Sequence, residues 1–71
     1  MTSQIRNHWG LFMGQVSDNS SCKLAYAYDM RYLGQYIKNI DMTYDSDMRI
    51  VGSGDLTTTL IYEYAREHGH G

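Results

Sequence analysis

The sequence predicts one small α+β domain spanning residues 1–71. Two periodicities and the composition support this class. Apolar residues alternate with a period of two over residues 22–28, which is typical of a β-strand. Beyond Asp29 the apolar period becomes that of an α-helix. With 42% hydrophobic and 20% charged residues, the chain has a globular composition, and its length limits it to one small core.

An N-terminal β-hairpin is expected over about residues 9–28. Residues 1–7 are polar and are expected to lack regular structure. The first strand of the hairpin is mostly apolar but contains Gly10 and Gly14, which favours a bulge or a close backbone approach. The polar run at residues 17–21 (SDNSS) is typical of the connecting loop.

A central amphipathic helix is expected over residues 29–40. Its apolar stripe follows the spacing i, i+3, i+7, i+10 and comprises Met30, Leu33, Ile37 and Ile40. Asp29 is suited to cap the N-terminus of such a helix. This interpretation accepts Gly34 inside the helix.

The C-terminal part allows two interpretations. Residues 41–47 are expected to form a turn, residues 48–51 a short strand and residues 52–55 another turn. A helix over residues 55–68 would begin at an aspartate cap and end before Gly69, whereas the three threonines and an Ile-Tyr pair favour a strand. The helix is preferred, giving the order ββαβα. The alternative order is ββαββ. No internal repeat or linker is apparent.

Charge and cysteine content limit the classes of function. The net charge is −2 and the six basic residues are scattered, which argues against nucleic-acid binding. The single cysteine, Cys22, excludes an internal disulfide and favours a reducing compartment, so a cytoplasmic location is expected. The N-terminus lacks the pattern of a signal peptide, and no apolar run is long enough for a membrane span.

Tyrosine is the most unusual feature of the composition, with seven residues. On the expected central helix, Tyr28, Tyr32 and Tyr36 have the spacing i, i+4, i+8 and would form one line beside the apolar stripe. Because tyrosine is enriched at protein interfaces, this line is the candidate partner-binding site. The competing interpretation is a partly buried flank that covers a small core.

Metal and cofactor sites have little support in the sequence. His68 and His70 are one residue apart, but no further ligand has a recognisable spacing. Asp45 and Asp47 resemble the start of a calcium loop, but Arg49 occupies the position of the third ligand. We therefore expect neither a metal nor a cofactor.

Catalytic groups are also sparse. Cys22 and His8 could act as nucleophile and base only if the fold brings them together. Glu63 and Glu67 would share one exposed helical face. The glycines of residues 52–54 could cradle a phosphate, but the motif lacks the lysine of a P-loop. An enzyme is therefore not expected.

The preferred hypothesis is a small non-catalytic protein that inhibits or regulates a larger protein by occlusion through the tyrosine line. The alternative is a small dimeric nucleic-acid-binding regulator that uses Arg31, Lys38 and Arg49. Self-association is compatible with both hypotheses, because so small a core gains stability from a partner chain.

Overall fold

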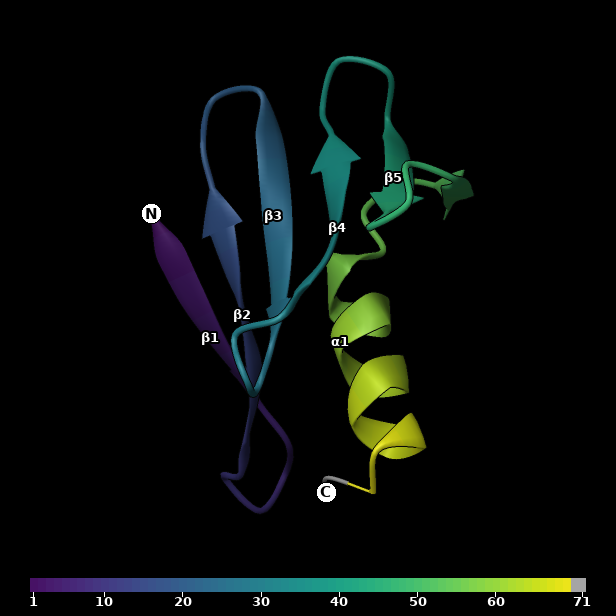
Figure 1. The fold of residues 1–71 in the computed structure, drawn as a ribbon. Coiled ribbons are helices and arrows are strands. Elements are labelled where there is room, and N and C mark those ends of the chain that lie inside the picture. Colours follow the sequence, from purple (N-terminus) through teal and green to yellow (C-terminus); the bar gives the residue numbers. More distant parts are fainter. Residues whose placement is uncertain (70–71) are drawn as a thin grey trace.

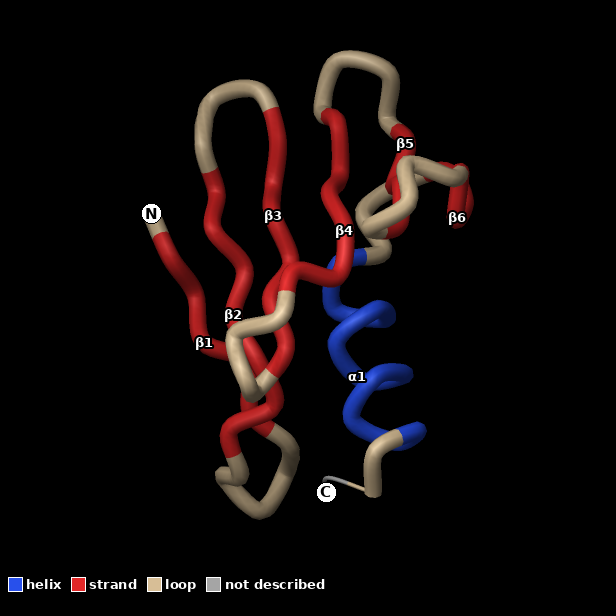
Figure 2. Tube along the Cα trace, in the orientation of Figure 1, coloured by secondary structure: helices blue, strands red, loops and turns tan. Residues whose placement is uncertain are grey.

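The computed structural model describes residues 1–69 as a six-stranded antiparallel sheet with one C-terminal helix (Figures 1 and 2). Strands that are adjacent in sequence are adjacent in the sheet, so the sheet is an up-and-down meander. The elements are β1 (Thr2–Arg6), β2 (Phe12–Asp18), β3 (Cys22–Ala27), β4 (Tyr32–Ile37), β5 (Met42–Asp45), β6 (Ile50–Ser53) and α1 (Thr57–Glu67).

The core lies between α1 and one face of the sheet. Ile61 and Ala65, one helical turn apart, are fully buried and face the middle strands. The sheet contributes small or slender side chains to this core, among them Val16 and Ala25. Small residues let the helix approach the sheet closely, which suits a chain with little apolar volume.

The expected α+β orders, ββαβα and ββαββ, are both wrong, because residues 1–69 are mostly β with a single helix. The central helix at 29–40 is replaced by a turn and by strand β4. Asp29 does not cap a helix. Its Oδ1 instead accepts a hydrogen bond from the backbone N–H of Arg31, two residues on, within the turn.

A β-bulge explains why β4 resembles a helix in sequence. Tyr26 of β3 pairs with Tyr32, and Ala25 pairs with Gly34, so Leu33 is an extra residue on β4. Leu33 and Gly34 consequently lie on the same side of the sheet, and the period of two is interrupted. With Met30 in the preceding turn, this interruption gives the apolar spacing of three and four that is typical of a helix.

Two segments expected to be irregular are strands. Residues 1–7 contain β1, which pairs with β2 through polar residues at the edge of the sheet. Residues 41–47 contain β5, in which Thr43 is fully buried. The Thr43 hydroxyl donates to the carbonyl of Gly54 at 2.6 Å and accepts from the N–H of Leu56 at 3.0 Å. A buried polar side chain thus anchors the start of α1 to the sheet.

Other expectations are confirmed. The hairpin expected over residues 9–28 is present as β2 and β3, although β1 precedes it, and a bulge lies beside Gly14. The C-terminal segment is a helix and not a strand. Gly69 follows its last turn with a φ of 68°, as a C-terminal glycine should. The helix begins after Leu56, one residue later than the expected aspartate cap.

Three turns at one end of the sheet share one geometry. They begin at Asn7, Ala27 and Asp45, and in each the N–H of the first residue donates to the carbonyl four residues on, at 2.9–3.0 Å. The fourth residue of each turn donates back to the first and has a positive φ. These fourth residues are Gly10, Met30 and Met48.

Each turn is followed by a strand with one extra residue and a glycine. The glycines are Gly14, Gly34 and Gly52, and each lies next to a register shift. Aligning the turns aligns the sequences NHWGLFMGQ (7–15), AYDMRYLGQ (27–35) and DSDMRIVGS (45–53). The chain therefore contains a threefold internal repeat, and the expectation that no repeat is present is wrong. We call each nine-residue segment a repeat unit.

Candidate protein-binding surface

Helix α1 covers only one face of the sheet, and the opposite face is the candidate surface. A Cβ on Gly14 would meet Ile61, and one on Gly34 would meet Leu60, so these glycines point towards α1. Alternation along the strands then assigns the other face residue by residue. We call it the helix-free face.

Cross-strand pairing arranges residues of the helix-free face in rows, of which two form the candidate surface. The first row crosses β1 to β4 and comprises Gln4, Gln15, Tyr26 and Tyr32. The second row crosses all the strands and comprises Thr2, Ser17, Leu24, Gln35, Tyr44 and Ile50. None of the residues in these two rows is buried and none carries a charge. One pair beyond the first row, Arg6 pairs with Phe12 and brings a charge to this face, where its guanidinium donates to Gln4 Oε1 at 3.0 Å. Two rows of this extent without a charged member are unusual because one fifth of the chain is charged.

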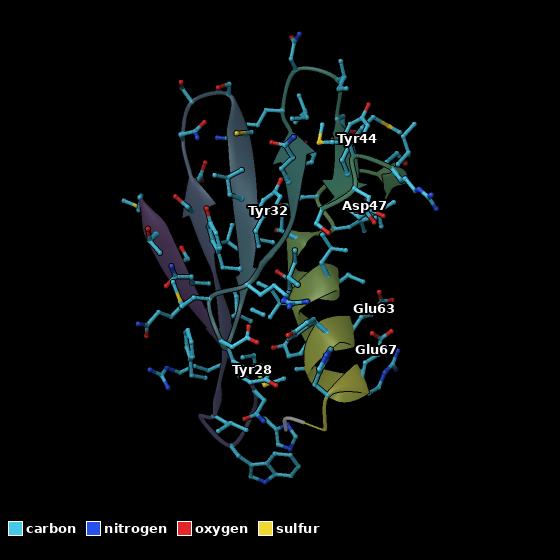
Figure 3. The ribbon with its side chains drawn as sticks, in the orientation of Figure 1. Tyr28, Tyr32, Tyr44, Asp47, Glu63 and Glu67 are labelled. Atoms are coloured by element: carbon cyan, nitrogen blue, oxygen red, sulfur yellow. The ribbon has the colours of Figure 1, made fainter. Side chains whose placement is uncertain are left out.

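Two tyrosines of this face, Tyr26 and Tyr32, contact each other. The rings of Tyr26 and Tyr32 lie with centroids 5.9 Å apart and planes inclined by 58°, a tilted geometry that aromatic pairs favour. Partial burial, together with the neighbouring Tyr26 and Cys22, raises the pKa of the Tyr32 hydroxyl. Tyr44 lies on β5, and Figure 3 shows Tyr32 and Tyr44 on separate strands of the same sheet.

The three tyrosines proposed from the sequence do not form a line, because the helix that would align them is absent. Tyr32 lies on the helix-free face, as described above. Tyr36 follows the bulge and shares the helix-covered side with Gly34. Tyr28 lies in the turn before β4 and packs against the core and the ring of Tyr64, at 5.8 Å. Only Tyr32 is therefore retained in the candidate surface, and its role in binding stays a prediction.

The sequence interpretation missed Tyr26, Tyr44 and Gln35 as members of the surface. The period of two along β3 places Tyr26 on the face of the sheet opposite to that of its neighbours Ala25 and Ala27, and the sequence alone shows this pattern. The position of Tyr44 depends on recognising residues 41–47 as a strand. The repeat units offered a second signal, since Tyr32 and Ile50 occupy equivalent positions in them.

Most charged residues other than Arg6 lie around the helix-covered side and the loops. Lys23 binds Asp55 at 2.9 Å, and Lys38 binds Asp18 at 2.7 Å. The hydrogen bond from Lys38 holds the pKa of Asp18 below its usual value. The basic residues of the nucleic-acid hypothesis are also dispersed, because Arg31 and Arg49 follow turns at one end and Lys38 lies at the other.

The candidate metal and calcium residues serve local structure. The His68 ring stacks on Tyr64 at 4.0 Å, while His70 lies outside the described residues. Asp45 Oδ1 accepts the backbone N–H groups of Asp47 and Arg49, which stabilises the turn. Within residues 1–69, no cluster of three or more histidine, cysteine or acidic residues could hold a metal ion.

The candidate catalytic residues are not brought together. His8 lies in the turn between β1 and β2, whereas Cys22 begins β3 at the opposite end of the sheet. Glu63 and Glu67 are exposed on α1 and point away from the sheet (Figure 3).

In the glycine turn before α1, two backbone amides that a phosphate would need are already hydrogen-bonded to side chains of the protein. The N–H of Leu56 donates to Thr43 Oγ1, and that of Thr57 donates to an Asp55 carboxylate oxygen.

Comparison with protein families, with curated proteins and with solved structures finds no match to this chain. Within the described residues, no helix is long and apolar enough to cross a membrane.

Proposed function

We propose that this chain is a small non-catalytic protein that binds a larger protein through the helix-free face, and regulates or inhibits it by occlusion. The observation that carries the proposal is the composition of the two rows, which combine tyrosine, glutamine and aliphatic residues without a charge. The buried centres of protein interfaces are likewise depleted of charge and enriched in tyrosine.

The partner that fits this face is a weakly charged protein surface. Tyr26, Tyr32 and Tyr44 each offer a rigid ring and a hydroxyl that can donate or accept a hydrogen bond. Gln15 pairs with Tyr26 and Gln35 with Tyr44, and they add amide donors and acceptors beside these rings. A nucleic acid would need several lysine or arginine residues beside its phosphates, whereas the rows contain none and Arg6 is a single basic residue at their border.

Tyr32→Ala combined with Tyr44→Ala tests the proposal. The double variant removes two rings from the face and adds no charge. Tyr62→Ala is the matched control, since it removes a 39%-exposed tyrosine from α1, on the covered side. Circular dichroism should show the same fold for all three proteins, and Tyr32→Phe combined with Tyr44→Phe replaces the alanine pair if that pair unfolds.

The assay is affinity capture from the native host's lysate, followed by measurement of Kd with the purified captured protein. The wild type and Tyr62→Ala should retain it, and the double variant should bind about 30-fold or more weakly, as expected for loss of a hot-spot tyrosine. Equal retention by the double variant, or capture of no protein, would contradict the proposal. Binding of oligonucleotides at about 50 mM salt would instead support the nucleic-acid alternative.

A further inference from the structure

We propose that the outer edge of β6 pairs with β6 of a second copy of this chain. The pairing would join two sheets across a twofold axis and would use a surface different from the helix-free face. It is inferred from a comparison of the three repeat units, which have the same construction but different surroundings.

The first difference is the pairing of the strand that follows each turn. In the first two repeat units this strand, β2 or β4, is paired on both sides. In the third unit the strand is β6, and among residues 1–69 it pairs only with β5. Its outer row of backbone donors and acceptors is therefore available to another strand.

The second difference is burial at equivalent positions. The extra residue of the bulge is Met13 in the first unit, only 4% exposed, and Leu33 in the second, packed against the core. In the third unit it is Val51, 39% exposed. Ile50 is 62% exposed, whereas its equivalent Tyr32 is half-buried. The apolar bulge residue is therefore covered in the first two repeat units and exposed to solvent in the third.

The occupant that this edge favours is another β6. The other open edge, β1, is polar and exposed except for Ile5. Pairing β6 with β1 would place the exposed Ile50 and Val51 beside a strand of mostly polar, exposed residues. Antiparallel pairing of β6 with itself can use the whole strand, and its twofold symmetry closes the assembly at a dimer.

A register consistent with the pleat places Val51 opposite Gly52 of the second copy, and Ile50 opposite Ser53 of the second copy. Each pair then lies on one face of the joined sheet. Gly52 has no side chain, but Leu56 Cδ1 lies 2.9 Å from the position of a Cβ there, so Val51 would meet the apolar Leu56 side chain of the second copy. Because β6 has only four residues, the interface is small and the dimer should be weak and concentration-dependent.

Sedimentation velocity over a wide range of protein concentrations tests this inference. Val51→Lys places a charge at the paired edge, which is how natural edge strands avoid association. Ile40→Lys is the matched control, because Ile40 is 51% exposed in the turn between β4 and β5. We expect the wild type and the control to dimerise, and Val51→Lys to raise the dissociation constant about tenfold or more.

Hydrogen exchange locates the contact. In the wild type and the control, the amides of residues 50–53 should exchange more slowly at high protein concentration than at low concentration. In Val51→Lys, their exchange rate should not depend on protein concentration. A wild type that stays monomeric at millimolar concentration would overturn the inference. A dimer unaffected by Val51→Lys would also overturn it, and equal weakening by Ile40→Lys would show that the effect is not local. Circular dichroism checks that each variant is folded.

Discussion

Replacing the equivalent glycines of the three repeat units by alanine should destabilise the fold to different extents, and the order of the three losses can be predicted. Gly34→Ala would place a Cβ 2.2 Å from the carbonyl oxygen of Tyr44 and 2.9 Å from Leu60 Cδ1. The φ of Gly34 is 157°, which residues with a side chain rarely adopt. The backbone of β5 would have to move, because a carbonyl oxygen cannot rotate out of the way as a side chain can.

Backbone strain and overpacking each cost roughly 1–3 kcal/mol. We therefore expect Gly34→Ala to lower the free energy of unfolding by about 2–4 kcal/mol. A chain of this length has a total stability of only about 4–10 kcal/mol. Gly14→Ala should behave similarly, because its Cβ would lie 2.3 Å from the carbonyl oxygen of Tyr26.

Gly52→Ala is the control at the third equivalent position. Its Cβ would meet only Leu56 Cδ1, the end of a flexible side chain, at 2.9 Å. The loss should stay below about 1 kcal/mol, since alanine also reduces the entropy of the unfolded chain. Urea unfolding followed by circular dichroism measures all three variants. Equal losses at Gly34 and Gly52, or a loss below about 1 kcal/mol at Gly34, would refute the close-approach argument.

Two further predictions concern the junction between the sheet and α1. Thr43→Val keeps the shape of the buried side chain but leaves the carbonyl of Gly54 and the N–H of Leu56 without their partner, so urea unfolding should show a loss of about 2–3 kcal/mol. Burial alone would raise the pKa of Asp55, but hydrogen bonds from Thr57 and Lys23 outweigh it and lower that pKa. Because the pKa is lower in the folded state, Asp55 stabilises the fold above its unfolded pKa of about 4, and this contribution is lost as the pH falls through the folded value. Asp55→Asn should therefore flatten the fall in stability below about pH 4, and an unchanged pH profile would count against the role of Asp55.

The sequence predicts local features of this fold better than its architecture. The loop, predicted at 17–21 and observed at 19–21, the bulge beside Gly14 and the helix before Gly69 follow from residues a few positions apart. The strand β4 could not be recognised by period, because its bulge shifts the apolar residues after Tyr32 by one position. Strands β1 and β5 are polar, and their structure depends on pairing with neighbours that a short window of sequence does not include.

The candidate surface shows the same limit. Tyrosine content indicates a binding surface, but the tyrosines that share a face are set by pairing across strands. Tyr32 and Tyr36 lie four residues apart in both the expected helix and the observed strand, yet the bulge at Leu33 sends them to opposite faces. Aligning the repeat units before assigning periods would have placed Tyr32 in a strand, because the aligned segments share the turn and the glycine.

The meander also determines how the chain can reach its structure. Every strand pairs with its nearest neighbour in sequence, so the contacts of the sheet close only short loops. Such low contact order favours rapid folding, in which each hairpin forms from its own turn. Helix α1 is the exception, because it packs on β2, β3 and β4, far from it in sequence. We therefore expect docking of α1 to be the step that joins locally formed hairpins into one cooperative unit.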